Sequence, residues 1–324
     1  MKRREFLGSM VGAATLSALP DLAMADAQYP NRPVRIVAGF AAGGGVDITA
    51  RLMGQWLNER LGQPFVTENR TGADGNIATE AVVNAPPDGY TLLLATLPNA
   101  VNASLYPKLN FVFLRDIAAV AGVIRVPMVA LVHPSLPAKS IAELIAYAKD
   151  NPGKINMASA GTGSAPHMAG ELFNSMAGVN MQHVPYRGQG PALSDLIGGQ
   201  VQILFAAAPG TVDYIKTQKL RALAVTSPTE ADVLKELPTI AATLPGYEAS
   251  QWYGLAAPAK TPADIIERLN QETNAAFADA AMKARFAAIS GEPIEGTPAQ
   301  FATLIANETE KWAKVVKFAG LKVQ

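Results

Sequence analysis

The chain has no cysteine among its 324 residues. A folded chain of this length buries enough surface to be stable without disulfide bonds. The absence of cysteine is compatible with an oxidising compartment without proving one. The sequence also lacks any run of about 20 apolar residues, the length that crosses a bilayer, so no membrane-spanning helix is expected. At about 150 residues per domain, the chain is long enough for two domains.

An excess of charge is also missing. The 27 Lys and Arg residues equal the 27 Asp and Glu residues, and no long basic run occurs. Such a chain lacks the electrostatic footprint of a nucleic-acid-binding protein. Only three histidines are present, His133, His167 and His183, and their spacing matches no common metal-ligand motif. No EF-hand loop occurs either. We therefore expect neither a metal nor a cofactor.

Residues 1–27 have the layout of a secretory signal peptide. Lys2 and the pair Arg3-Arg4 precede a mildly apolar stretch over 8–19, and small-residue exits follow at Ala25 or Ala27. The twin arginines favour the twin-arginine route, which leads to the periplasm. Cleavage after Ala25 would remove three basic and two acidic residues and leave a net charge of −1. The alternative is a disordered basic tail.

Two glycine-rich turns, 39–47 and 159–167, are the most informative feature. Each follows an apolar run, 34–38 or 155–158, that predicts a buried strand, and each opens a helix. The N-terminus of a helix offers unpaired N–H groups and the positive end of the macrodipole. It can therefore bind an anion without a basic side chain. Two such turns predict two lobes that face one anionic ligand.

The first turn fits no nucleotide motif. It lacks the G-x-G-x-x-G spacing of a dinucleotide fold, and no Gly-Lys-Ser/Thr follows as in a P-loop. Three successive glycines, Gly43 to Gly45, allow a backbone to approach a ligand closely. The alternative is a tight strand–helix turn that binds nothing.

Apolar runs alternate with helical stretches along most of the chain, which predicts an α/β fold with mostly parallel sheets between helices. In the first helix Ile48, Leu52 and Trp56 recur at every fourth position, with Asp47 as cap and Gly62 as stop. Two later helices are expected to begin at the Thr-Pro pairs 261–262 and 297–298, with each threonine as the cap.

We expect the terminal helices to pack back on the first lobe. The first lobe would then comprise 28–126 plus 252–324, and the second 127–251. Two crossing segments, near 123–129 and 250–254, would form the hinge.

Several side chains could have either a functional or a structural role. Ser164 and His167 could serve an exported serine-type hydrolase, but the G-x-S-x-G elbow is absent, and Ser164 is also a natural N-cap. Arg187 follows a strand, where α/β sheets bind ligands, and it could fork onto a carboxylate or only order its own loop. Thr96 and Asn99 follow another strand and are polar candidates for ligand contact.

The chain resembles the extracytoplasmic receptors of tripartite tricarboxylate transporters, the Bug family, in motifs that run along the whole mature sequence. These motifs include Tyr29-Pro-x-Arg-Pro33, Gly43-Gly-Gly-x-Asp47, Glu68-Asn-Arg70, Pro87-Asp-Gly-Tyr-Thr-Leu92, Gly161-x-Gly-Ser164 with His167, Val184-Pro-Tyr-Arg-Gly188 and Trp252-Tyr-Gly254. Each motif is weak alone, but together and in order they are specific.

The resemblance implies a two-lobed, hinge-closing periplasmic binding protein of type II, monomeric, that binds a small organic carboxylate. It would hand this ligand to the large and small membrane subunits of a transporter, or signal to a sensor kinase. Carried over to this chain, with the candidates above, the ligand-binding residues are Phe40, Ala41, Ala42, Gly43, Gly44, Gly45, Asp47, Thr96, Asn99, Ala160, Gly161, Thr162, Gly163, Ser164, His167, Tyr186, Arg187, Gly188 and Ala208.

Two departures from the family pattern bear on loop rigidity and ligand identity. The first turn reads Ala38-Gly39-Phe40-Ala41-Ala42, where the family usually has prolines that fix φ. The loop after Arg70 carries Thr71 and Asp74 where proline and glycine are common.

Overall fold

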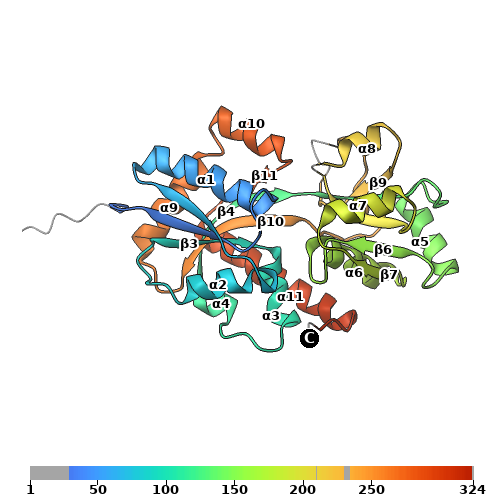
Figure 1. Ribbon diagram of the computed structural model, residues 1–324, viewed down its shortest axis with the longest axis horizontal. Helices are drawn as coiled ribbons and strands as arrows, with labels where there is room; N and C mark the ends of the chain where they lie inside the picture. Colours follow the sequence, from blue (N-terminus) through green and yellow to red (C-terminus); the bar gives the residue numbers. More distant parts are fainter. Residues whose placement is uncertain (1–28, 209, 230–233, 323–324) are drawn as a thin grey trace, which may run out of the picture.

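The computed structural model describes residues 29–208, 210–229 and 234–322 (Figure 1). The expected signal peptide, 1–27, lies outside these residues. Figure 1 shows two α/β halves joined by extended segments, each half with its own sheet. Among the residues described, no helix is both long enough and apolar enough to cross a membrane.

The first sheet has six strands. Their spatial order is β11 (Glu292–Pro293), β4 (Ile117–Val126), β10 (Gln251–Pro258), β3 (Thr91–Thr96), β1 (Val34–Ala38) and β2 (Phe65–Asn69). Its central strands are apolar at successive positions because both faces are covered. Leu92 and Leu94 of β3 face one core cluster and Leu93 faces the other.

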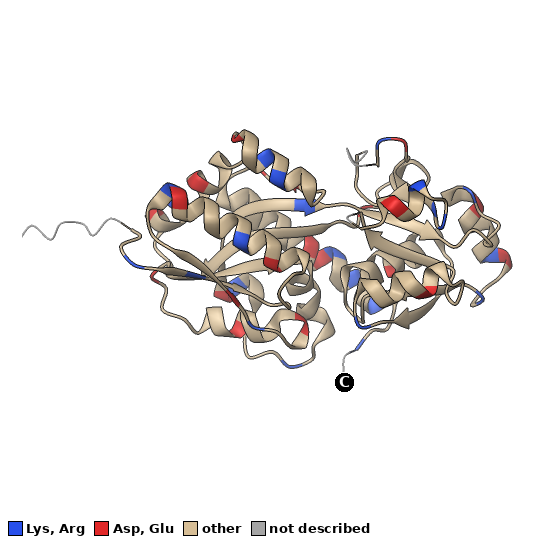
Figure 2. Ribbon diagram, turned by 45° about the horizontal axis from the view of Figure 1, so that its top comes forward, with Lys and Arg blue, Asp and Glu red and all other residues tan. Residues whose placement is uncertain are grey.

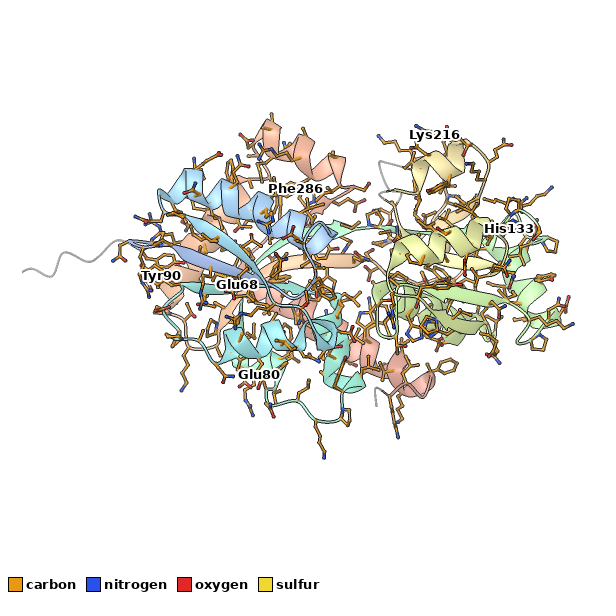
Figure 3. All side chains as sticks on the ribbon, viewed as in Figure 1. Glu68, Glu80, Tyr90, His133, Lys216 and Phe286 are labelled. Carbon is orange, nitrogen blue, oxygen red and sulfur yellow. The ribbon has the colours of Figure 1, made fainter. Side chains whose placement is uncertain are left out.

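Helices cover both faces of this sheet. One face carries α1 (Gly45–Leu61), α9 (Ala263–Ala275) and α10 (Ala280–Ala288), and the other carries α2 (Asn76–Val83), α3 (Leu97–Leu105) and α11 (Pro298–Phe318). The short helix α4 (Phe113–Asp116) precedes β4. Phe286 of α10, labelled in Figure 3, is 1% exposed and packs into the core on the α1 side.

The second sheet has five strands. Their spatial order is β7 (Gln182–Pro185), β6 (Asn156–Ser159), β8 (Ile203–Ala207), β5 (Met128–Val132) and β9 (Arg221–Val225). One face carries α5 (Ile141–Asp150) and α6 (Ala165–Ala177), and the other carries α7 (Gln189–Ile197) and α8 (Val212–Lys216). Strand β6 pairs in parallel with β7 and β8.

The two-lobed α/β architecture, with a sheet flanked by helices in each lobe, is confirmed. Both sheets are mixed, since β10 runs antiparallel to β3 and β4, and β5 runs antiparallel to β8 and β9. The chain crosses between sheets from β4 into β5 and returns into β10. Gln251 pairs with Val126 at the crossing. Because β10 returns alongside β4, it must run against it.

Helix α11 contacts α3 and β4 on the first sheet and also α6 on the second. At the middle of α11, the buried carboxylate of Glu308 accepts hydrogen bonds from the indole N–H groups of Trp252 (3.2 Å) and Trp312 (2.8 Å). Lys311 pairs with Glu308 and with Glu248. The helix therefore packs on the first half, reaches the second and contacts the return crossing.

The sequence predicted the end of α1 correctly but not its cap. Gly62 ends α1 in the left-handed conformation, with φ 72°, as expected. Asp47, however, lies inside the helix, and Ile48 is 42% exposed, because the buried stripe runs through Ala50, Met53 and Leu57.

The two Thr-Pro starts differ. Thr297 caps α11 by accepting a hydrogen bond from the Gln300 N–H. Pro262 takes the cap position of α9, because the Thr261 hydroxyl donates to Pro258 O instead.

Candidate functional site

A cavity of about 300 Å³ lies between the two halves. Segments of both sheets and of the return crossing contribute to it. The lining residues are Phe40, Val46, Asp74, Thr96, Leu97, Pro98, Ala160, Gly161, Thr162, Gly163, Ser164, Ala165, Pro166, Gly188, Gln189, Gln251 and Tyr253.

Four helices begin at this cavity. Val46 lies in the first turn of α1, Leu97 begins α3, Ala165 begins α6 and Gln189 begins α7. Each helix start directs N–H groups and the positive end of a dipole toward the lining. Within the described part of the chain, no Lys or Arg lines the cavity, although both signs of charge occur over both halves of the molecule (Figure 2). The arrangement can bind an anion through backbone groups.

Asp47 organises the first glycine turn. Its carboxylate accepts hydrogen bonds from the Gly43 N–H (2.9 Å), Asn69 Nδ2 (3.0 Å) and Arg51 Nε (3.0 Å). Asn69 Nδ2 also donates to Phe40 O at 3.0 Å. The hydrogen bond from Arg51 lowers the pKa of Asp47 to about 2, helped by those from Gly43 and Asn69 and opposed by burial. Asp47 therefore shapes the turn from beneath and does not line the cavity.

The second turn is held in a similar way. Ser164 occupies the N-cap position of α6, as expected, but its hydroxyl donates to Gly161 O at 2.6 Å. The Gly163 N–H donates to Nδ1 of His167 at 3.0 Å. Gly163 has φ 79°, a region that favours glycine, and a Cβ there would lie 2.6 Å from Leu105 Cδ2 of α3. The two halves thus meet closely at this turn.

Two histidine rings stack beneath the second turn. His167 is fully buried and its ring centroid lies 3.6 Å from that of His183. Because His167 Nδ1 accepts a hydrogen bond, its proton is on Nε2, which lies 3.5 Å from Glu171 Oε1. His183 Nε2 lies 2.6 Å from Ser159 Oγ. Burial, and next the neighbouring His167, lower the pKa of His183 to about 4, so it is neutral at pH 7.

Asn99 supports the cavity wall without lining it. Its Oδ1 accepts from the Thr96 N–H (2.7 Å), and its Nδ2 donates to Thr79 Oγ1 (2.8 Å). On the return crossing, the Tyr253 hydroxyl donates to Gln251 Oε1 at 2.6 Å.

The cavity brings together eight of the predicted ligand-binding residues: Phe40, Thr96, Ala160, Gly161, Thr162, Gly163, Ser164 and Gly188. The other predicted residues lie outside its lining: Ala41, Ala42, Gly43, Gly44, Gly45, Asp47, Asn99, His167, Tyr186, Arg187 and Ala208.

Besides His167, three of those outside come from the second half. Tyr186 donates its hydroxyl to Asp195 Oδ2 at 2.7 Å, and burial with this bond raises the pKa of Tyr186 to about 12. Arg187 is exposed and, within the described ranges, forms no ion pair. Ala208 is buried, and its N–H donates to Pro127 O.

Nine lining residues had not been expected from the sequence: Val46, Asp74, Leu97, Pro98, Ala165, Pro166, Gln189, Gln251 and Tyr253. Six of them stand at helix starts, so the helix-start signals could have indicated them. Gln251 and Tyr253 carry no local signal, because only the long-range pairing of β10 brings them to the cavity.

The geometry does not assemble a serine nucleophile. A nucleophilic serine needs a base within hydrogen-bonding reach. The Ser164 hydroxyl is bonded to Gly161 O, and His167 Nδ1 to the Gly163 N–H. Over the described part of the chain, no group of three or more His, Asp or Glu residues is arranged to hold a metal ion.

Comparison with known proteins gives consistent matches. A family model described as "Tripartite tricarboxylate transporter family receptor" matches residues 49–321. Protein BugT of Bordetella pertussis is 38% identical over 299 residues, covering 91% of this chain and 92% of BugT.

Two solved structures from Rhodopseudomonas palustris are also similar. Rpa4515 with adipate is 36% identical with a TM-score of 0.79, over 91% of this chain and all of that one. MatC with bound malate is 31% identical with a TM-score of 0.75, over 89% of this chain and all of that one. The match to the family model covers most of the described residues, and it includes both halves of the cavity. The chain therefore belongs to the tripartite tricarboxylate transporter receptor family.

Proposed function

We propose that the protein binds a small organic carboxylate in the cavity between its two halves and releases it unchanged. The observation that carries this proposal is the convergence of four helix starts on a cavity whose described lining residues include no Lys or Arg. Helix N-termini stabilise an anion through N–H groups and dipoles. The ligands named for Rpa4515 and MatC, adipate and malate, are carboxylates and support this class.

The binding energy needed is modest. Micromolar affinity corresponds to about −8 kcal/mol. Each hydrogen bond to a charged group contributes about 1.5–3 kcal/mol. The helix starts at Gly45 and Ala165, one in each half, leave N–H groups that find no acceptor among the backbone carbonyls of their own helix. Several such bonds to one desolvated carboxylate suffice for a transport receptor.

The two halves would close on the ligand about the crossings. We assign 28–126 plus 252–324 to one moving lobe and 127–251 to the other. In this proposal the protein is periplasmic and delivers its ligand to the large and small membrane subunits of the transporter. The competing partner is a membrane sensor kinase, and identification of the membrane protein that co-purifies with the receptor separates the two.

A thermal-shift panel tests the ligand class. The purified protein, refolded to remove bound ligand, is titrated with mono-, di- and tricarboxylates, amino acids and aromatic acids, each also analysed for product formation. At least one acid should raise the melting temperature and remain chemically unchanged. A panel with no stabilising acid would refute carboxylate binding, and turnover would refute a receptor that releases its ligand unchanged.

A bulky substitution tests the location. Thr162 is exposed and lines the cavity, so Thr162→Trp should fill the cavity without disturbing the core. Thr303, exposed on α11 and away from the lining, provides the matched control Thr303→Trp. Isothermal titration should show binding lost in the first variant and kept in the second. Equal affinities in both would place the ligand elsewhere.

A further inference from the structure

Among the residues that the structure describes, Asp74 is the only charged side chain that lines the cavity. The helix starts around it favour a negative charge, whereas a carboxylate at the wall disfavours a second one. A sphere of the cavity's volume is about 8 Å across, similar to the Debye length at physiological ionic strength, so salt screens this repulsion incompletely. The cavity thus combines helix starts that favour an anion with one carboxylate that favours a cation.

Asp74 is held firmly in this position. It lies in the turn η1 (Ala73–Gly75), where its carbonyl accepts a hydrogen bond from Asn102 Nδ2 at 3.0 Å. Its Oδ2 accepts from the Tyr106 hydroxyl at 2.7 Å. Burial, with this bond, raises the pKa of Tyr106, so Tyr106 keeps its proton and donates it. Two side chains of α3 or its C-terminal cap therefore fix both the backbone and the carboxylate of Asp74.

One carboxylate oxygen remains available. Within the described residues, no hydrogen bond to Asp74 Oδ1 and no ion pair of Asp74 with Lys, Arg or His is found. The backbone of Asp74 has φ 50°, a left-handed conformation that aspartate adopts more readily than most residues but less readily than glycine. Glycine would fit the backbone conformation of this turn better, so the conformation alone does not require aspartate. The carboxylate adds an unpaired acceptor to the cavity wall.

We propose that Asp74 determines the ligand class of this receptor: an acid whose carboxylate binds the helix starts and whose distal ammonium group binds Asp74. Amino acids with a distal amino group meet this requirement, and plain dicarboxylates do not. The proposal rests on the proposed function, since it assigns the distal half of the same ligand. It would set this chain apart from Rpa4515, whose structure contains the dicarboxylate adipate.

The alternative is that Asp74 only ties its turn to α3 through Tyr106. Asp74→Asn separates the two roles, because asparagine keeps an oxygen for the Tyr106 hydroxyl and loses the charge. If Asp74 is only a tie, this variant should leave ligand preference unchanged. Asp264→Asn, an exposed aspartate in the first turn of α9 and outside the cavity, is the matched control.

The experiment compares pairs of acids of equal length by isothermal titration: 4-aminobutanoate with succinate, 5-aminopentanoate with glutarate, and 6-aminohexanoate with adipate. In the best-binding pair, the amino acid should bind about tenfold or more tightly than the dicarboxylate, as expected for one charge-assisted hydrogen bond. Asp74→Asn should remove or reverse this ratio, and Asp264→Asn should preserve it.

Three results would overturn the proposal: a dicarboxylate that binds as tightly as its amino partner, a ratio unchanged in Asp74→Asn, or no binding of any of the six acids. None of these refutes the proposed function while another carboxylate of the wider panel still binds in the cavity. Only failure of every acid refutes both.

Discussion

Replacement of Asp47 by asparagine should loosen the first glycine turn and destabilise the protein at neutral pH. The carboxylate of Asp47 is 5% exposed and joins the Gly43 N–H, Asn69 and Arg51. Its pKa is lowered from 3.8 to about 2, chiefly by Arg51. A shift of this size corresponds to about 2.4 kcal/mol. Since Arg51 is 54% exposed and screened by solvent, we expect a loss of about 1–2 kcal/mol.

The stabilisation that the Asp47 carboxylate provides should depend on pH. A carboxyl group whose pKa is lower in the folded state stabilises the protein above its unfolded pKa, near 3.8, and loses this effect as pH falls through about 2. The difference between wild type and Asp47→Asn should therefore be full at pH 7, shrink below about pH 4 and vanish only below about pH 2. Urea unfolding followed by tryptophan fluorescence measures the difference at each pH.

The control is again Asp264→Asn, which should leave the midpoint nearly unchanged at pH 7. Hydrogen exchange over residues 40–46 should be faster in Asp47→Asn, and its affinity for the carboxylate ligand should fall although Asp47 does not line the cavity. A pH-independent difference between wild type and Asp47→Asn, or no difference at pH 7, would refute the role given to this carboxylate.

Two further variants test the junction of the halves. Glu308→Ala leaves the buried indole N–H groups of Trp252 and Trp312 without their acceptor. Each unpaired group costs about 1–3 kcal/mol, so the urea midpoint should fall clearly. The control Glu310→Ala, on the exposed side of α11, should leave the midpoint unchanged, and equal effects of the two variants would contradict the role given to Glu308. Gly163→Ala and Gly178→Ala share a backbone cost of about 1 kcal/mol at positive φ, but only the first places a Cβ against Leu105 of the other half. Titration should therefore show weaker ligand binding in Gly163→Ala alone, and equal affinities would show that this contact does not matter for closure.

Local signals in the sequence predicted the elements well. Gly62, Thr297 and Ser164 mark helix ends correctly, because each acts through backbone conformation or a hydrogen bond to a near neighbour. The apolar repeat that begins at Ile48 does not mark the most buried face of α1, which runs through Met53, since periodicity alone does not distinguish adjacent stripes of one helix. Thr261 was misjudged because Pro258 O competes for its hydroxyl.

The features that the sequence did not predict depend on contacts between residues far apart in the chain. Mixed sheets follow from the return of β10 beside β4, which no local pattern records. The same pairing brings Gln251 and Tyr253 to the cavity, and the fold of α3 against the turn at Asp74 brings Tyr106 to its carboxylate. His167 is buried and its stacking on His183 depends on β7 lying beside β6.

A crystal structure of the protein with an acid that stabilises it tests the central claim most directly. The account predicts that the acid lies in the cavity between the halves, with its carboxylate oxygens within hydrogen-bonding distance of N–H groups at the starts of α1 and α6. A carboxylate bound instead by the Arg187 side chain, or outside the cavity altogether, would contradict the account.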